Sequence, residues 1–292
     1  MPSRTAVLRA LAALLGVAPS LGAQTTTAPS TTTATAAAAA PPPADRIPVH
    51  DSFTVQSRAL GEPRLVNVYV PAAYRDAAAA GRRFPVLYMP DGALDEDFPH
   101  VVNTVDSLIA LGVVRPVIVV GIPNTQRRRD LTGPTRVHSD SAIAKRVGGS
   151  AAFRRFIGEE LMPVVNARYR TTAERSIVGE SLAGLFIVET FVLEPTLFDH
   201  YVALDPSVWW DGETLVDSVA PRRLAALDGR PRTLFLASSD TPDIAAGTAR
   251  LAEILKTAAR PGLAWSYAPR PDLTHATIFR GIGPAALAAA LK

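Results

Sequence analysis

One short segment of the sequence has the residue types of a nucleophilic site. Residues 179–183 read Gly-Glu-Ser-Leu-Ala, after an apolar run at 176–178 and before an apolar stretch at 185–192. A serine between small residues at a strand-to-helix turn forms a nucleophile elbow, which exposes the hydroxyl at the N-terminus of the helix. Ala183 replaces the usual second glycine but is small enough for this turn. The pattern predicts Ser181 as a nucleophile.

A serine nucleophile needs a histidine base, and the base needs a carboxylate to hold its tautomer. In hydrolases with this elbow the chain order is serine, acid, histidine. Three of the five histidines precede Ser181, and His200 directly precedes the next expected strand. His275 lies in a late loop before the C-terminal helical pattern, so we predict it as the base.

Two aspartates are candidates for the acid. Both lie in the stretch Ser-Ser-Asp-Thr-Pro-Asp at 238–243, which follows an expected strand at 233–237. Asp240 is nearer the strand end and is the preferred candidate, while Asp243 could equally cap the next helix. The sequence leaves both assignments open.

An oxyanion hole requires two backbone N–H groups, one after the nucleophile and one from the loop after the third strand. Leu182 would supply the first donor. The loop at 89–93, Met-Pro-Asp-Gly-Ala, would supply the second through Ala93 or Gly92. Asp-Gly is also a common turn dipeptide, so this loop has a purely structural interpretation as well.

The elements that must position these residues alternate between apolar β-rich runs and helical patterns, which is typical of an α/β protein. The first two strands alternate as an antiparallel edge pair would, and later ones are apolar throughout, as strands covered on both faces are. Helical faces are expected within 101–109 and 153–164. The expected strands are 53–57, 65–70, 86–89, 117–121, 176–178, 201–204, 233–237 and 264–267.

Composition excludes several functional classes. The 292 residues are 48% hydrophobic and include no cysteine, which removes disulfides, thiolate nucleophiles and Cys-ligated metals. A net charge of +3 does not indicate nucleic-acid binding. No two histidines or carboxylates show metal-ligand spacing with a third partner, so we expect neither a metal nor a cofactor.

The N-terminal region differs from the rest of the chain. Residues 1–23 combine Arg4 and Arg9, a short apolar run and small residues near Ala23, which is the layout of a secretory signal peptide. Residues 24–44 are almost only Thr, Ala and Pro and predict a disordered linker. We expect residues 45–292 to form a single domain, without a membrane span, in the periplasm or outside the cell.

With these residues placed, the chain resembles the "putative esterase" family of α/β hydrolases, which contains enterobactin-type siderophore esterases, esterase D and several feruloyl esterases. The resemblance runs from about residue 53 to the C-terminus. Beside the elbow, it is carried by LYMPDG (87–92), VVGIPN (119–124), RDLT (129–132), FIGEELMP (156–163), LFD (197–199) and DPSVWW (205–210).

The resemblance implies an α/β-hydrolase fold, with a mostly parallel central sheet and helices on both faces. It also implies that Ser181 is the nucleophile and His275 the base, with Gly92, Ala93 and Leu182 around the oxyanion. Family members differ in their acid. Asp205 stands where many members have serine, which points to a subgroup.

Several further residues are candidates for contacts with the substrate. Arg129, in the Arg run at 127–129, could bind an anionic or catecholate group, although such a run is also a common solvated loop. Trp209 and Trp210 could form an aromatic wall, with one of them in the core. Glu180 is expected to be a packed, hydrogen-bonded carboxylate without a chemical role.

Two hypotheses follow. The first is an exported serine esterase that hydrolyses a carboxylic ester through an acyl-enzyme, with a siderophore-type or an aryl or feruloyl ester as substrate. The second is a catalytically silent protein that keeps the fold and binds a small ligand. The presence of the serine, the histidine and the elbow together favours the first. The oligomeric state does not follow from the sequence.

Overall fold

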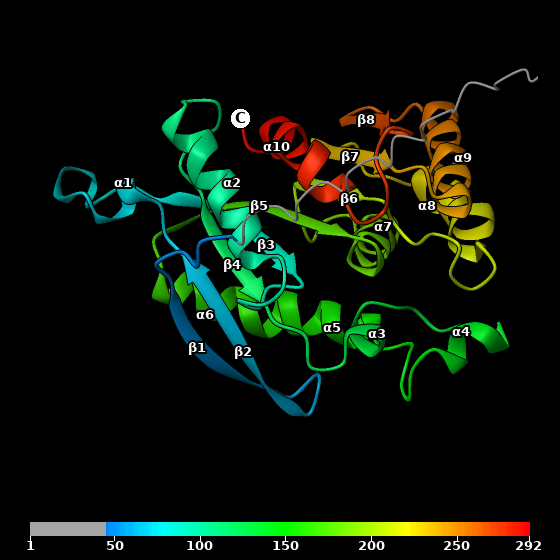
Figure 1. Ribbon diagram of the computed structural model, residues 1–292, viewed down its shortest axis with the longest axis horizontal. Coiled ribbons are helices and arrows are strands. Elements are labelled where there is room, and N and C mark those ends of the chain that lie inside the picture. The colour runs from blue at the N-terminus through cyan, green and yellow to red at the C-terminus, as the bar shows by residue number, and fades with distance from the viewer. Residues whose placement is uncertain (1–44) are drawn as a thin grey trace, which may run out of the picture. The chain divides into compact units, whose positions relative to one another are not determined.

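The computed structural model describes residues 45–292, which contain one eight-stranded sheet with the order β1-β2-β4-β3-β5-β6-β7-β8 (Figure 1). The strands pair in parallel from β4 to β8, whereas β1 and β2 are antiparallel to their neighbours. The strands are β1 (Asp51–Ser57), β2 (Glu62–Tyr69), β3 (Phe84–Pro90), β4 (Ile118–Ile122), β5 (Thr171–Glu180), β6 (His200–Leu204), β7 (Arg232–Ser238) and β8 (Leu263–Pro269).

All eight expected strands are present, and the antiparallel pair lies at the edge of the sheet as predicted. Every residue of β3 and β4 is buried, because helices cover both faces of the sheet there. Every residue of β8, at the opposite edge, is partly or fully exposed.

Helices cover the sheet in two layers (Figure 1). One face packs against α2 (Phe98–Ala110) and α10 (Ile278–Ala290), with Phe98, Val105 and Phe279 in its core. The other face packs against a larger group of helices. These are α5 (Ser150–Arg155), a π-helical segment η2 (Phe156–Leu161), α6 (Met162–Arg168), α7 (Leu182–Leu193), α8 (Ala220–Leu224) and α9 (Pro242–Ala258).

The two predicted helical faces are both found in these layers. The face within 101–109 belongs to α2, and the face within 153–164 runs through α5, η2 and α6. The remaining short elements are α1 (Ala72–Arg75), η1 (Ala77–Ala79), α3 (Arg127–Asp130), α4 (His138–Ala142) and η3 (Leu215–Val219).

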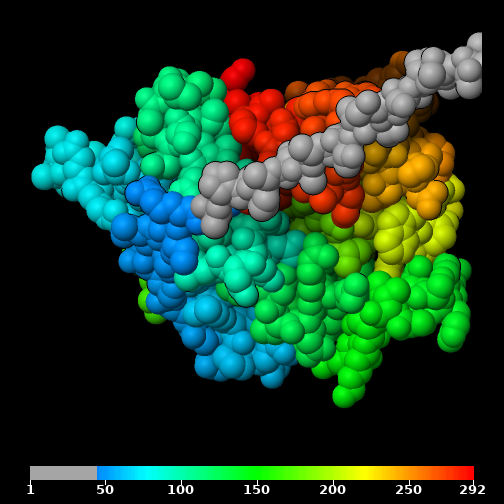
Figure 2. All heavy atoms as spheres, in the orientation of Figure 1, coloured from blue at the N-terminus to red at the C-terminus, as the bar shows by residue number. Residues whose placement is uncertain are grey.

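A long connection between β4 and α5 carries α3 and α4 over the surface. In Figure 2 this green segment lies at the lower right, below the yellow and orange surface of α8 and α9. It begins directly after β4, where the parallel strands have their carboxyl ends. Ligands of open α/β sheets bind at this end of the strands, so the connection borders the expected site.

Within residues 45–292 there is no helix of the length and apolarity that a membrane crossing requires. The predicted signal peptide (1–23) and linker (24–44) lie outside the described residues.

Candidate active site

The elbow forms where the sequence predicts it. β5 ends at Glu180, α7 begins at Leu182, and Ser181 between them has φ 61° and ψ −121°. This positive φ is uncommon for a residue other than glycine and stores backbone strain at the turn. A Cβ on Gly179 would lie 2.6 Å from the Cβ of Ala183, so glycine is required there.

The strained turn is held by the strand next to β5. The amide of Ser181 donates to the carbonyl of Leu204 at 3.0 Å, and the amide of Ser207 donates to the carbonyl of Ser181 at 3.1 Å. The hydroxyl oxygens of Ser181 and Ser207 are 3.5 Å apart. Sequence reasoning placed Ser207 in a family motif but missed its position beside the nucleophile.

His275 lies in the loop after β8, with its Nε2 atom 3.2 Å from Ser181 Oγ. Its side chain is 44% exposed, so the ring forms the solvent-facing side of the pair. The structure therefore brings together the two residues that the sequence predicts as nucleophile and base. The distance permits proton transfer from the hydroxyl to the ring.

The carboxylate beside His275 belongs to Asp205, with Oδ2 2.5 Å from His275 Nδ1. The prediction that Asp240 orients the histidine is therefore wrong. Asp240 is exposed, and in residues 45–292 only its backbone amide makes a hydrogen bond, to the carbonyl of Leu273. Asp243 is exposed in the first turn of α9.

Asp205 reaches the histidine because it follows β6, the strand next to the elbow strand. It adopts a positive φ of 45° and its side chain is fully buried. Ser239, from the loop after β7, holds the carboxylate: its amide donates to Oδ1 at 2.6 Å and its hydroxyl to Oδ2 at 2.7 Å. The β7 loop thus supplies a support for the acid and not the acid itself.

The electrostatics of the pair favour a charged histidine. The hydrogen bond to Asp205 raises the pKa of His275 above its usual value. Burial alone would raise the pKa of Asp205, but its hydrogen bonds with His275 and Ser239 outweigh burial and lower it. Asp205 consequently stays ionised and stabilises an imidazolium.

A second carboxylate lies close to the same ring. Glu180 Oε1 is 4.0 Å from His275 Nδ1, and ligand atoms of Glu180, Asp205 and His275 lie within 4.8 Å of one another. Both ring nitrogens of His275 already have partners, Asp205 and Ser181. These contacts are those of a Ser-His-Asp triad flanked by an extra carboxylate.

The amides expected around the oxyanion differ in availability. Leu182 is the first residue of α7, where amides have no partner within the helix. The amide of Gly92 donates to the carbonyl of Ile122 at 3.2 Å and so belongs to the backbone frame. The amide of Ala93 donates to Glu96 Oε2 at 2.9 Å, so an oxyanion would have to displace this side chain before Ala93 could act as the second donor.

Arg129 does not face a substrate. Its side chain is only 7% exposed, and it donates to Glu62 Oε1 and Asp130 Oδ1 at 2.6 Å each. The pair with Glu62 connects α3 to β2, and the pair with Asp130 lies within α3. The prediction of Arg129 as a substrate-binding residue is not supported, because its donors are used inside the protein. Arg127 forms a two-bond pair with Asp91 at 2.7 and 2.8 Å.

The two tryptophans differ in burial, and one of them lies in the core as expected. Trp210 is 4% exposed, and its indole N–H donates to the carbonyl of Gly133 at 2.9 Å, so it is a core residue and not part of a substrate wall. Trp209 is partly exposed and packs against the same core. Of the two, only Trp209 stays a candidate for substrate contact.

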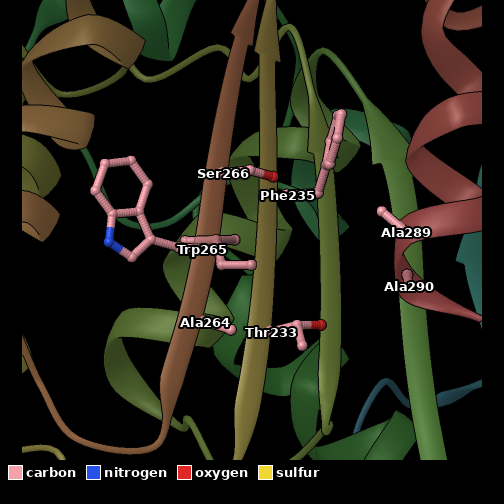
Figure 3. A pocket seen from close by; sticks show the side chains of 8 residues that line it. Thr233, Phe235, Ala264, Trp265, Ser266, Ala289 and Ala290 are labelled. Carbon is pink, nitrogen blue, oxygen red and sulfur yellow. The ribbon is translucent and has the colours of Figure 1, made fainter.

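A hollow of about 250 Å³ lies away from these groups (Figure 3). It is lined by the first halves of β7 and β8 and by Ala289 and Ala290 of α10. Phe235 points toward α10, whereas Trp265 points to the other side of the sheet. The triad loops follow the opposite ends of these strands, so the hollow is separate from the candidate site.

The mostly parallel sheet, the strained serine between β5 and α7, and the hydrogen-bonded serine, histidine and aspartate define an α/β hydrolase. A family model described as "Putative esterase" matches residues 57–246. The chain belongs to this family.

Curated relatives match about half of the chain. The ferri-bacillibactin esterase BesA of Bacillus subtilis is 28% identical over 174 residues, which cover 51% of this chain and 56% of BesA. The siderophore triacetylfusarinine C esterase of Aspergillus fumigatus is 29% identical over 163 residues, covering 52% of this chain and 53% of the relative. The chain thus spans a little over half the length of these two relatives.

Solved structures match more of the fold. An IroE-like serine hydrolase from Shewanella oneidensis superposes with a TM-score of 0.74 at 26% identity, covering 82% of this chain and 79% of that one. The BES protein from Bacillus cereus superposes with a TM-score of 0.71 at 19% identity, covering 84% and 97%. The second likeness concerns the fold alone.

Proposed function

We propose that the protein is an exported serine esterase that hydrolyses a carboxylic ester through an acyl-enzyme, without a cofactor. The observation that carries this proposal is the continuous line of contacts from Asp205 through His275 to Ser181. The substrate class we propose is a siderophore-type ester, because both relatives described above are siderophore esterases. An aryl ester is the second substrate to test, because a ferulic acid esterase shares the fold.

The geometry supports the following sequence of steps. Ser181 Oγ attacks the carbonyl carbon of the ester while His275 Nε2 accepts the hydroxyl proton. The amides of Leu182 and Ala93 donate to the oxyanion. His275 returns the proton to the leaving alcohol, and an acyl-serine remains. Water then attacks the acyl-serine through the same base, which releases the acid and restores Ser181.

A fluorophosphonate probe tests this mechanism, because it phosphonylates a serine only where the hydroxyl is activated. We expect one equivalent of label on the wild-type protein and none on Ser181→Ala, which also loses ester hydrolysis. Ser207→Ala is a matched control, since its hydroxyl is 3.5 Å from that of Ser181. This variant should still be labelled at Ser181. A folded wild-type protein that takes up no label would indicate the silent ligand-binding alternative.

Substrate choice and export are tested separately. A panel of a ferric trilactone siderophore, a feruloyl ester and a short chromogenic ester should rank by kcat/KM, with the siderophore first. For export, N-terminal sequencing of protein expressed with its own leader should show a chain that begins near Gln24, outside the cytoplasm. Retention of Met1 in the cytoplasm would contradict export and leave the hydrolase proposal unchanged.

A further inference from the structure

Two carboxylates converge on one nitrogen of the predicted base. Asp205 Oδ2 is 2.5 Å from His275 Nδ1, and Glu180 Oε1 is 4.0 Å from the same atom. Glu180 is the last residue of β5, directly before Ser181, and its backbone is paired with Leu204 of β6. The serine–histidine–aspartate line uses only the first carboxylate.

The two carboxylates differ in how they are held. Both oxygens of Asp205 accept hydrogen bonds, from Ser239 and from His275. Glu180 Oε1 is buried and has no hydrogen-bond partner among residues 45–292. The expectation that Glu180 is a hydrogen-bonded carboxylate is therefore wrong for this oxygen. A buried polar atom without a partner costs stability, so the position of Glu180 Oε1 beside the ring of His275 calls for an explanation.

Charged groups from several elements face Glu180. They are His275 from the loop after β8, Asp97 before α2, Asp205 after β6, and Arg127 of α3. Burial, with the nearby acids Asp97 and Asp205, raises the pKa of Glu180 to about 7 against the opposing charges of His275 and Arg127. The charge of each group, Glu180 and His275, therefore shifts the pKa of the other.

We propose that Glu180 is a positioning residue for His275, a second carboxylate that stabilises the imidazolium from its Nδ1 side during ester hydrolysis. The proposal rests on the serine mechanism proposed above. When His275 accepts the proton of Ser181, its Nδ1–H continues to donate to Asp205, and the ring gains a positive charge. An ionised Glu180 at 4.0 Å lowers the energy of that charge without forming or breaking a bond. If Asp205 is removed, Glu180 is the nearest remaining carboxylate.

The test is the pH profile of kcat/KM for Glu180→Gln, which removes the charge and keeps the shape. Without the negative charge, the pKa of His275 falls. The acid limb should therefore move to lower pH by about one unit, and two coupled ionisations should become one. The plateau rate should fall about threefold to tenfold, because the imidazolium is less stabilised. An acid limb unchanged from wild type would overturn the proposal.

Asp97→Asn is the matched control, because burial also raises the pKa of Asp97, to about 6, and Asp97 faces Glu180. We expect this variant to keep two ionisations. If Asp97→Asn and not Glu180→Gln removes the second ionisation, Glu180 does not have the proposed role.

Fluorophosphonate labelling at Ser181 and the thermal unfolding midpoint are measured on each variant. A failure of the serine mechanism would abolish the label in wild type as well, so it is distinguishable from a failure of this proposal.

A double-mutant cycle gives a second, independent readout. In the Asp205→Asn background, Glu180→Gln should lower kcat more than it does in wild type, because no carboxylate then remains at the ring. If Glu180→Gln lowers kcat by the same factor in wild type and in Asp205→Asn, the two carboxylates do not share a role at His275.

Discussion

Two neighbouring loops at the carboxyl end of the sheet each begin with polar residues directly after a buried strand, yet they have different roles. The loop after β6 starts with Asp205, which is buried and contacts His275. The loop after β7 contains Ser239, whose amide and hydroxyl hold Asp205, and then the exposed Asp240. One loop supplies the acid and the other supplies its support.

The difference shows that proximity to a strand end does not decide which carboxylate serves a histidine. The side chain of Asp205 points into the protein because its backbone has a positive φ of 45° and its carboxylate accepts a hydrogen bond from the amide of Ser239. Asp240 lies only one residue beyond Ser239, but its side chain faces solvent. A carboxylate that is buried and fully hydrogen-bonded keeps a fixed orientation and its charge, whereas the side chain of an exposed carboxylate has no fixed orientation.

Asp205→Asn should give the largest effect in either loop. The amide cannot hold the tautomer in which Nδ1 carries the proton, so kcat should fall by about three to four orders of magnitude. Steady-state kinetics with a chromogenic ester measure this loss, and circular dichroism checks the fold. Activity within tenfold of wild type would remove Asp205 from the triad.

The pH dependence of hydrolysis is a second test of the role of Asp205. Hydrolysis requires neutral His275, and Asp205 raises the pKa of that ring above its usual value. Activity in wild type should therefore be lost, as pH falls, at a higher pH than an unperturbed imidazole with a pKa near 6.5 would give. In Asp205→Asn the remaining activity should persist to lower pH. The acid limb of a plot of kcat/KM against pH, recorded for wild type and for Asp205→Asn, measures both shifts.

Ser239→Ala should give an intermediate effect, because it removes the hydroxyl bond to Asp205 and leaves the amide bond in place. Loss of one hydrogen bond to a charged group is worth about 1.5 kcal/mol, or roughly tenfold in kcat if it acts through the orientation of His275. Kinetics and the midpoint of urea unfolding separate an effect on catalysis from one on stability. An effect as large as that of Asp205→Asn would mean that Ser239 alone keeps Asp205 in place.

Asp240→Asn and Asp243→Asn should give the smallest effects, each changing kcat by less than about twofold, as is usual for exposed side chains. The same ester assay checks both. A loss of several hundredfold in either one would reverse the roles assigned to the two loops.

Most of the fold could be predicted from the sequence, because it depends on patterns that are local. The apolar run at 117–121 and the alternation at 53–57 each predict their strand without knowledge of the rest of the chain, and the structure has these strands at 118–122 and 51–57. The elbow is also local, since Gly179, Ser181 and the apolar helix after them are contiguous. Ser181 and His275 were found because their chain order is characteristic of α/β hydrolases.

The acid could not be predicted in the same way, because its selection depends on contacts between loops. Asp205 and Ser239 are 34 residues apart in the chain. The available signal was an aspartate directly after a buried strand, next to the elbow strand in the sheet order. The prediction for Arg129 fails for a similar reason: its partner Glu62 is 67 residues away, and the adjacent Asp130 alone does not indicate that the donors of Arg129 are used inside the protein.

The contact between Gly179 and Ala183 limits the order in which the elbow can change during evolution. Ala183 occupies the space that a glycine at this position would leave open, and a Cβ on residue 179 would meet it at 2.6 Å. A side chain at 179 would therefore need glycine at 183 first, and its Cβ would even then lie 3.3 Å from the backbone carbon of residue 183. In the present chain position 179 is closed to every residue other than glycine, so the two positions can change only in one order.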